Sequence, residues 1–442
     1  MSPQPLRVAL LEEPASPPAT ATALGYVDAV DEDENENGAT LQVARCLARA
    51  GHQVDVFTRR DDPDAPAFVD VRPGLRRLHM TAGPARCVAG QALLAHLPEF
   101  SRSMQRLFAR SVRYDVVHAN GLLSGLAALR LKEGFGMPLV MSLDVRRPPA
   151  QDAETFASER IDIERRLVAH ADRLVAECAH DKAELMRLYR APPRAIATVP
   201  RGVDTDELAP ASRSEARRTL GLADDEFVVL QLGRLAPGKG IDNVIRAIAQ
   251  LPSAARVRLL VVGGASRAPD ERATPEIARL RRLAAQCGVA NRITFVGRRR
   301  RAELAALYNA CDVFVTTPWH QALGITALEA MACGTPVVGS AVGGIASSVV
   351  DGVTGYLVAP HDPEALAERL AHLRAHPELA RALGRAGLRR VRSRFSLERV
   401  AEALIDIYEA VRWRAHEAHQ AHDRHRLRLV GRAGGRAQEA HA

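Results

Sequence analysis

The stretch Thr316–Ser340, which reads TTPWHQALGITALEAMACGTPVVGS, decides the fold. It joins two short apolar runs, CDVFVTT at 311–317 and TPVVGSA at 335–341, through a helical segment that begins near Ile325. Gly324 precedes this segment and a Gly-Thr-Pro sequence follows it, and these residue types commonly flank helices. The pattern predicts a strand, a helix and a strand, which is the repeating unit of a parallel sheet covered by helices on both faces.

The same alternation of short apolar runs and longer amphipathic segments continues along the chain in two series. The first series contains LRVALL, QVDVFT, YDVVHA, PLVMSL and ADRLVAEC. The second contains FVVLQLG at 227–233, VRLLVVGG at 257–264, RITFVG at 292–297 and the two runs of the opening stretch. Between the series, VPRGVDTDELAPASRS is rich in linker residues. The sequence predicts an α/β fold of two Rossmann-like domains that face each other across a cleft, over 1–208 and 209–395.

Length and composition agree with two globular domains. The chain has 442 residues, 47% of them hydrophobic and 25% charged, and one domain usually takes about 100 to 200 residues. The net charge of +8 is spread along the chain and only 4% of the residues are aromatic, which argues against a nucleic-acid-binding surface. Lysine occurs only at 132, 182 and 239, whereas arginine is abundant. A lysine at a predicted ligand site is therefore informative.

The cysteines and the N-terminus bear on location. Six cysteines are scattered without any C-x-x-C pair, which predicts reduced, buried thiols. The start, MSPQPLRVALLEEP, has no basic segment followed by a long apolar run, and no stretch reaches the roughly 18 apolar residues of a membrane span. We therefore expect a cytoplasmic protein without a membrane span.

The loop after the run 227–233 has the residues of a phosphate-binding turn. It reads GRLAPGKG, in which Gly233 and Arg234 close the strand and Lys239 precedes a helix that begins near Ile241. Helix N-termini and glycines present N–H donors to a phosphate, and Arg and Lys neutralise its charge. A solvated loop with two basic residues fits the spacing equally well. Because Lys239 is one of just three lysines, we favour the phosphate site.

The helix of the opening stretch offers a second set of ligand groups. Its first amides, at Ile325 and Thr326, follow Gly324 and are expected to point into the cleft, where they suit a diphosphate. Side chains lean toward the N-terminus of their helix, so the carboxylate of Glu329 reaches the same place. A carboxylate there suits the hydroxyls of a ribose. The alternative is a surface Glu that interacts only with the helix dipole.

Several runs together resemble the retaining GT-B glycosyltransferases of family 4, a group with sucrose-phosphate-synthase-like and mycothiol-pathway members. In the second half they are GRLAPGKGIDNVIRAI, PWHQALGITALEAMACGTPVVGSAVGGI and DGVTGYLVAPHDPEALAERL. In the first half LARAGHQVDVFTRRDDP, YDVVHAN and VPRGVD are similar in order and spacing, so that the resemblance covers about residues 6–412. It implies an acceptor-side N-terminal domain, a nucleotide-sugar-binding C-terminal domain, and a helix over 396–414 that crosses back to the N-terminal domain. We expect a disordered tail over 415–442, which lacks a sustained apolar stripe.

The resemblance assigns roles to the residues of the nucleotide half. Arg234 and Lys239 match the pair that binds the donor diphosphate and stabilises the leaving group. Ile325 and Thr326 match the amide donors, and Glu329 matches the carboxylate that binds the ribose. The implied reaction uses UDP-sugar or GDP-sugar as a substrate, needs no cofactor or divalent metal, and retains the anomeric configuration. The leaving phosphate takes the acceptor's proton, so no protein nucleophile is required.

The residues expected around the sugar and the acceptor depart from the family pattern. Gln321 stands at the first Glu of the motif E-x7-E, which usually contacts the ring hydroxyls of the donor sugar. Asp144 stands where the family has a His that usually touches the C6 hydroxyl. Glu34 and Asn35 align with a Gly-Gly pair that normally lies close to the donor phosphates. The donor-sugar site is therefore predicted to be divergent.

Two explanations compete for this divergence. Random loss of function is expected to replace Arg234 and Lys239 as readily as the residues that contact the sugar, yet Arg234 and Lys239 are retained. We therefore favour an active enzyme whose specificity has changed to another sugar. Asp144 and the acidic cluster at 31–36 favour a cationic group, which indicates an amino sugar or a sugar modified at C6, in secondary metabolism. A narrower resemblance, to lincosamide-type S-glycosyltransferases, implies a thiol acceptor. The alternative is an inactive partner protein that binds the nucleotide without turnover.

The acceptor side carries weaker signals. His118 ends the predicted strand at 114–119 and Asn120 follows it, where the family often places an acceptor-side residue, but a buried, hydrogen-bonded His fits equally well. Arg146 and Arg147 follow Asp144 and suit an anionic acceptor, although paired arginines more commonly lie in a solvated loop. We expect a small-molecule acceptor, no nucleic-acid partner, and a homodimer as the candidate assembly.

Overall fold

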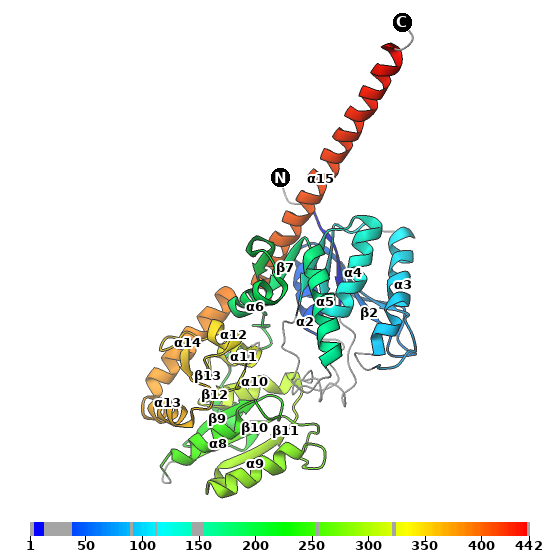
Figure 1. The fold of residues 1–442 in the computed structure, drawn as a ribbon. Coiled ribbons are helices and arrows are strands. Elements are labelled where there is room, and N and C mark those ends of the chain that lie inside the picture. Colours follow the sequence, from blue (N-terminus) through cyan, green and yellow to red (C-terminus); the bar gives the residue numbers. More distant parts are fainter. Residues whose placement is uncertain are drawn as a thin grey trace.

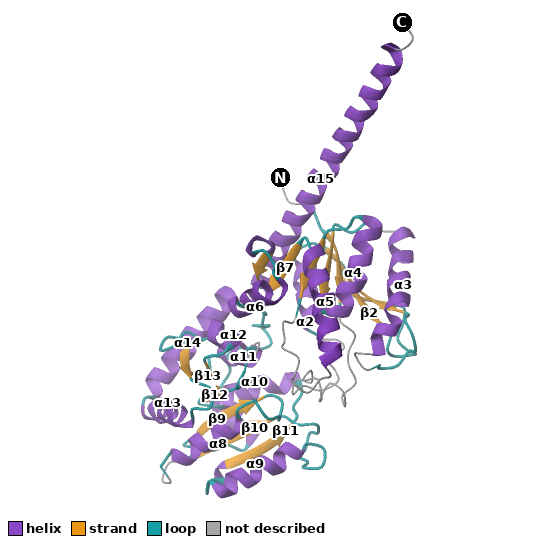
Figure 2. Ribbon diagram, in the orientation of Figure 1, coloured by secondary structure: helices purple, strands orange, loops and turns teal. Residues whose placement is uncertain are grey.

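The computed structural model describes residues 4–12, 38–88, 92–110, 113–143, 154–252, 256–320 and 324–439. These residues form two α/β domains, and a long last helix runs from the C-terminal domain across the N-terminal one (Figure 1). Each domain has one sheet flanked by helices (Figure 2). The predicted fold of two Rossmann-like domains is confirmed.

The N-terminal sheet has eight strands in the order β3-β4-β2-β1-β5-β6-β7-β8. All of its strand pairs are parallel except β3 with β4. Its strands are β1 (Arg7–Leu11), β2 (Gln53–Arg59), β3 (Phe68–Arg72), β4 (Leu75–Met80), β5 (Val116–Asn120), β6 (Leu139–Ser142), β7 (Arg173–Ala176) and β8 (Ile196–Thr198). The helices are α2 (Ala39–Arg49), η2 (Ala92–His96), α3 (Leu97–Arg110), α4 (Leu122–Phe135), α5 (Glu154–His170), α6 (Ala179–Tyr189) and η3 (Pro193–Ala195).

The C-terminal sheet has six strands in the order β11-β10-β9-β12-β13-β14, and all pairs are parallel. Its strands are β9 (Phe227–Leu232), β10 (Val257–Val262), β11 (Ile293–Gly297), β12 (Val313–Thr316), β13 (Val337–Ser340) and β14 (Gly355–Val358). The helices are α7 (Arg213–Leu220), α8 (Ile241–Gln250), α9 (Pro275–Gln286), η4 (Ala290–Arg292), α10 (Arg301–Ala310), α11 (Ile325–Ala332), α12 (Gly343–Ser348), α13 (Pro363–Ala375) and α14 (Pro377–Arg394). The opening stretch of the sequence is thus β12, α11 and β13, as predicted.

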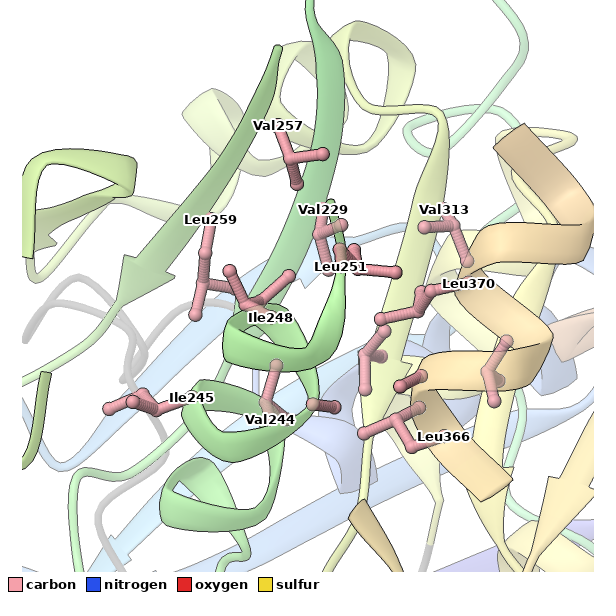
Figure 3. Packing of buried hydrophobic residues seen from close by; sticks show 14 of the residues in the cluster. Val229, Val244, Ile245, Ile248, Leu251, Val257, Leu259, Val313, Leu366 and Leu370 are labelled. Atoms are coloured by element: carbon pink, nitrogen blue, oxygen red, sulfur yellow. The ribbon is translucent and has the colours of Figure 1, made fainter. Parts of the chain in front are cut away.

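The core of the C-terminal domain fixes α8 against the sheet (Figure 3). Ile241, Val244, Ile245 and Ile248 recur at helical spacing and are all buried in one cluster with β9, β10 and α13. Full burial of such a side chain contributes about 1.5–3 kcal/mol. This packing holds the N-terminus of α8, which begins at Ile241, at the carboxyl edge of the sheet.

The last helix, α15 (Leu397–Glu439), joins the two domains. Leu404, Tyr408 and Val411 are buried with residues of α2, β1 and β5 in the core of the N-terminal domain. Beyond that contact α15 projects away from the domain (Figure 1), and Trp413 is exposed. The structure therefore differs from the predicted disordered tail, since the helix continues to Glu439. The segment after 415 is rich in Ala and Arg, which are strong helix formers, and extending an existing helix adds one hydrogen bond per residue.

The cysteines are free, and four of them, Cys46, Cys178, Cys311 and Cys333, are buried as predicted. Cys87 is exposed, which the sequence pattern did not indicate. Within the described ranges no helix is both long enough and apolar enough to span a bilayer.

Candidate functional site

The two sheets present their carboxyl ends to each other. A small cavity between the domains is lined by Cys178 and Arg201, which follow β7 and β8, and by Gly344 and Ser347, which follow β13. Ligands of doubly wound sheets bind beyond the carboxyl ends of strands. The segments that follow β9, β12 and β13 on one side, and β5 and β6 on the other, are therefore the candidate site.

The predicted phosphate loop lies between the end of β9 and the start of α8. Its turn is made by Gly233, Gly238 and Gly240, which have φ angles of 145°, 84° and 72°. Arg234 and Lys239 lie in the same loop, and both side chains are half-buried. The loop thus presents two cations in front of the N-terminus of α8, where an anion is stabilised by the helix amides and dipole.

This loop is locked to the segment that follows β12. The Thr317 hydroxyl donates to the Gly240 carbonyl at 3.0 Å, and the Trp319 amide donates to the Gly238 carbonyl at 2.9 Å. Thr317 is fully buried, and the Trp319 ring packs against the His361 ring with a centroid distance of 4.5 Å. The phosphate loop and the segment Thr317–Trp319 therefore form one hydrogen-bonded unit.

Gly240 makes a close contact between the phosphate loop and the segment that follows β12. This contact predicts that a larger residue at position 240 destabilises the protein. A Cβ atom on Gly240 would lie 1.7 Å from the Thr317 carbonyl oxygen, at a φ angle of +72°. We expect Gly240→Ala to lower the free energy of unfolding by about 2–4 kcal/mol, because backbone strain and overpacking add. The measurement is urea unfolding followed by circular dichroism.

Gly288→Ala is the matched control for Gly240→Ala. Gly288 lies in the same domain with a φ angle of +71°, but a Cβ atom there meets nothing within 4 Å. Its substitution isolates the backbone strain, which we expect to be about 1 kcal/mol. Equal losses of stability in the two variants would show that the contact with Thr317 is not the reason for the glycine.

The N-terminus of α11 also lies at the carboxyl edge. Gly324 caps it in the left-handed region with a φ angle of 76°, and its carbonyl accepts from the amides of Ala327 and Leu328 at 3.1 and 3.2 Å. Ile325 and Thr326 come before these donors, in the part of a helix whose amides have no intrahelical acceptor. Gly324 packs so closely that a Cβ atom there would lie 3.0 Å from the Ile345 amide nitrogen. This contact with the start of α12 fixes the direction of α11.

Glu329 of α11 is buried rather than on the surface, with 5% of its area exposed. The Tyr308 hydroxyl donates to its Oε2 at 2.7 Å, and Arg301 Nη1 lies 3.6 Å from its Oε1. Arg301 Nε also donates to Glu207 at 2.8 Å. Burial and the charge of Glu329 raise the pKa of Tyr308 well above its usual value, so the phenol remains a hydrogen-bond donor. The alternative of a surface Glu does not fit this environment.

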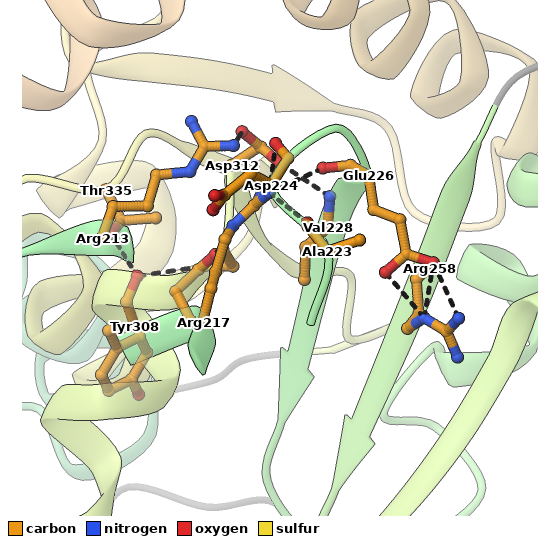
Figure 4. Close-up of polar contacts among 12 residues, drawn as sticks. Arg213, Arg217, Ala223, Asp224, Glu226, Val228, Arg258, Tyr308, Asp312 and Thr335 are labelled. Atoms are coloured by element: carbon orange, nitrogen blue, oxygen red, sulfur yellow. Dashed lines mark hydrogen bonds and ion pairs between the residues drawn. The ribbon is translucent and has the colours of Figure 1, made fainter. Parts of the chain in front are cut away.

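Tyr308, Arg301 and Glu207 have no recognisable signal in the sequence. Tyr308 reads as one more apolar position of α10, and it is completely buried. Its carbonyl accepts from the Thr335 hydroxyl at 2.7 Å (Figure 4), which ties α10 to the end of α11. Arg301 belongs to a run of four arginines, in which nothing distinguishes it. Only the tertiary structure brings these residues to Glu329.

His118 lies inside the N-terminal domain and does not line the acceptor side. It is 4% exposed and lies in the middle of β5. Its Nδ1 lies 2.7 Å from the Tyr408 hydroxyl of α15, and its Nε2 lies 2.9 Å from the Ser142 hydroxyl of β6. Of the two interpretations of this residue, the buried histidine fits the structure. The acceptor-side assignment of His118 is corrected, because both ring nitrogens already have protein partners.

This burial predicts a pH dependence of stability. Burial lowers the pKa of His118 to about 4, whereas an unfolded histidine titrates near pH 6.5. Between these values only the unfolded state binds the proton, so the stability is complete above pH 6.5 and is lost as the pH falls toward 4. We expect the wild type to lose about 2 kcal/mol more than His118→Asn between pH 7 and pH 5, as measured by urea unfolding. Parallel losses in both proteins would contradict this.

Asn120 marks the carboxyl edge of the N-terminal sheet. It is the last residue of β5 and is half-buried, and its Nδ2 donates to the Thr40 hydroxyl at 3.4 Å. Thr40 is the second residue of α2, so Asn120 lies beside the N-terminus of that helix. Its acceptor-side role stays a prediction.

The remaining predicted site residues lie outside the described residues. They are Glu34, Asn35, Asp144, Arg146, Arg147 and Gln321. Their predicted roles depend on the sequence alone. Among the described residues, those that come together at the C-terminal carboxyl edge are Gly233, Arg234, Lys239, Gly324, Ile325, Thr326 and Glu329.

Two family models match the chain. The model described as glycosyl transferases group 1 matches residues 212–390, and the model described as glycosyltransferase family 4 matches residues 39–207. Together they cover both domains. The boundary between the matches falls in the segment that joins β8 to α7.

Several named proteins are similar to this chain over nearly its whole length. D-inositol 3-phosphate glycosyltransferase of Actinosynnema mirum is 36% identical over 92% of this chain and 97% of its own. The protein of the same name from Xylanimonas cellulosilytica is 37% identical over 91% and 96%. Among solved structures, sucrose-phosphate synthase from Thermosynechococcus elongatus has a TM-score of 0.75 at 30% identity and covers 92% of this chain and 99% of its own. Anabaena HepE, solved with UDP and glucose, has a TM-score of 0.69 at 20% identity over 91% and 99%, a likeness of fold alone.

Proposed function

Because this chain belongs to the group 1 glycosyl transferases and uses a nucleoside-diphosphate sugar, we propose that it transfers an amino sugar or a C6-modified sugar to a small molecule. Transfer retains the anomeric configuration, uses a UDP-sugar or GDP-sugar as the substrate, and requires neither a divalent metal nor another cofactor. The bond between the anomeric carbon and the diphosphate breaks, and a bond to the acceptor forms on the same face. The leaving phosphate oxygen takes the acceptor's proton.

The observation that carries the donor assignment is the locked loop at the end of β9. Its hydrogen bonds with Thr317 and Trp319 hold Arg234 and Lys239 at the same sheet edge as the N-terminus of α11. Two cations and a helix N-terminus suit a diphosphate, whose charge grows as the sugar leaves. We assign the amides of Ile325 and Thr326 to the diphosphate and Glu329 to the ribose hydroxyls.

The proposal for the donor sugar rests on the residues that replace the family pattern. Asp144 is acidic where a His usually meets the C6 hydroxyl, and Gln321 replaces a Glu that contacts ring hydroxyls. An acidic group favours an amine on the sugar. We expect turnover with a nucleotide-linked amino sugar to exceed turnover with the matching glucose donor, and Asp144→Asn to remove the preference. A preference that survives in Asp144→Asn would overturn this assignment.

Two acceptors are candidates. D-inositol 3-phosphate is supported by the name of the relatives, which are 36–37% identical to this chain, and Arg146 and Arg147 suit its phosphate. The second candidate acceptor is a thiol of secondary metabolism. It is supported by the departure of the donor-sugar residues from the family pattern, which indicates a specialised product. The test incubates the protein with a donor that it binds and with either D-inositol 3-phosphate or, as the thiol, ergothioneine. Mass spectrometry of the products then distinguishes O-linked from S-linked transfer.

Calorimetric titration with UDP and with GDP tests the donor site itself and identifies the base. Tight binding of one nucleotide, and turnover with its sugars, is the expected result. Binding without turnover over the full panel of donors and acceptors would favour the inactive partner protein instead. The cytoplasmic location and the homodimer stay predictions, and size-exclusion chromatography with light scattering tests the second.

A further inference from the structure

We propose that Tyr308 and Arg301 are positioning residues, which hold the Glu329 carboxylate in the orientation that binds the ribose of the donor nucleotide. This inference rests on the proposed function, in which Glu329 accepts the ribose hydroxyls. Neither residue is assigned to contact the substrate. Both act through the carboxylate that does.

Tyr308 is fixed so that its hydroxyl has one direction available. The side chain is completely buried, and its ring packs edge-on against Phe314 of β12 with a centroid distance of 5.5 Å. Its backbone carbonyl is held by the Thr335 hydroxyl (Figure 4). With both the ring and the backbone held, the hydroxyl at 2.7 Å fixes the rotation of the Glu329 carboxylate about its terminal bond.

Arg301 places a positive charge beside this buried carboxylate. A buried carboxylate is unfavourable unless a positive group or hydrogen-bond donors compensate it. Arg301 Nη1 lies 3.6 Å from Glu329 Oε1, while Nε of the same guanidinium donates to Glu207 at 2.8 Å. Glu207 lies in the segment between the two domains, after β8 and before α7. A carboxylate of the interdomain segment therefore holds the cation in place beside Glu329.

The arrangement suits recognition of a vicinal diol. A carboxylate has about four lone-pair sites, so one that accepts from a tyrosine hydroxyl also has sites for two neighbouring ribose hydroxyls. Hydrogen bonds to an ionised acceptor are stronger than neutral ones and depend on direction. Without Tyr308 the carboxylate can rotate, and the two ribose hydroxyls lose their fixed acceptors.

The test compares ribonucleotides with 2′-deoxyribonucleotides by calorimetry. The wild type is titrated with whichever of UDP and GDP it binds, and with the matching dUDP or dGDP. We expect the wild type to bind the ribonucleotide about 10-fold more tightly than the deoxynucleotide, since one hydrogen bond to a charged group is lost. Tyr308→Phe is expected to weaken the ribonucleotide more than the deoxynucleotide, which keeps only the 3′-hydroxyl, so that the ratio of the two dissociation constants falls toward one. Arg301→Gln is expected to change the ratio in the same direction, and it keeps the test available if Tyr308→Phe does not fold.

Tyr114→Phe is the matched control. Tyr114 is also buried, and its hydroxyl donates to the Asp55 carboxylate at 2.6 Å, but both residues belong to the N-terminal domain. The same chemical change there is expected to leave the ratio as in the wild type. An unchanged ratio in Tyr308→Phe and Arg301→Gln, or an equal weakening of both nucleotides, would show that these residues are merely structural. A wild type that binds UDP or GDP no better than its deoxy form would also overturn the inference, and one that binds neither would overturn the proposed function first.

Discussion

Lys239→Ala is expected to lower the affinity for the donor nucleotide, UDP or GDP, by about 100-fold or more. Loss of one partner of a half-buried charge pair costs about 2–5 kcal/mol, part of which reflects the charge left without compensation. Lys239 lies between Gly238 and Gly240, whose carbonyls are both held by the segment after β12. No neighbouring cation is therefore expected to move into its place. Calorimetric titration with both nucleotides measures the effect.

The control for Lys239→Ala is a change of the same kind at another of the three lysines. Lys132 forms a partly exposed ion pair with Asp172 at 2.6 Å in the N-terminal domain. Lys132→Ala is expected to leave nucleotide affinity unchanged, so it reports any general effect of removing a positive charge. If Lys239→Ala binds the nucleotide as tightly as Lys132→Ala does, the loop after β9 is not the diphosphate site. Glycosyl transfer would then require a donor site elsewhere on this chain.

Much of the fold could be predicted because its signals are local. The start of α11 at Ile325 followed from the preceding Gly324, and each apolar run that was named became a strand. The edge strand β3 and its neighbour β4 gave no such signal, since β4 reads LRRLHM and β3 is largely exposed. The helix after 415 was missed for a different reason. A missing apolar stripe indicates that a segment has no packing partner, but it does not prevent a helix that is already nucleated from continuing.

The candidate site likewise contains one part that local sequence predicts and another that depends on distant contacts. The phosphate loop is a continuous segment whose glycines and cations can be recognised in order. The environments of Glu329 and His118 depend on residues far away in sequence, because Tyr408 lies 290 positions from the histidine that it contacts. A single sequence does not show which of its distant residues come into contact. The donor-side prediction therefore needed only local pattern, whereas the sequence left open whether His118 is an acceptor-side residue or a buried, hydrogen-bonded histidine.

Arg217→Met is expected to destabilise the protein more than any other substitution considered, by about 5 kcal/mol or more. The side chain of Arg217 is 1% exposed, and its Nη2 donates to Asp312 Oδ2 at 2.7 Å. The rest of the guanidinium donates to four backbone carbonyls (Figure 4), those of Ala223, Asp224, Glu226 and Ala310. Breaking a buried ion pair costs about 3–5 kcal/mol, and each buried carbonyl left without a donor adds about 1–3 kcal/mol.

Arg213→Met is the matched control, because Arg213 lies one turn earlier on α7 and contacts the other oxygen of the same carboxylate, Asp312 Oδ1, at 2.5 Å. Its side chain is 48% exposed, so we expect a loss below about 1 kcal/mol. Urea unfolding of both variants at pH 7 measures the difference, and similar losses would show that the carbonyl contacts of Arg217 contribute little. Asp312 also accepts from the Val228 amide at 2.7 Å, so Arg217 connects α7 to β9 and β12. Those two strands lead into the phosphate loop and the segment that locks it, and we therefore expect Arg217→Met to weaken nucleotide binding through the scaffold alone.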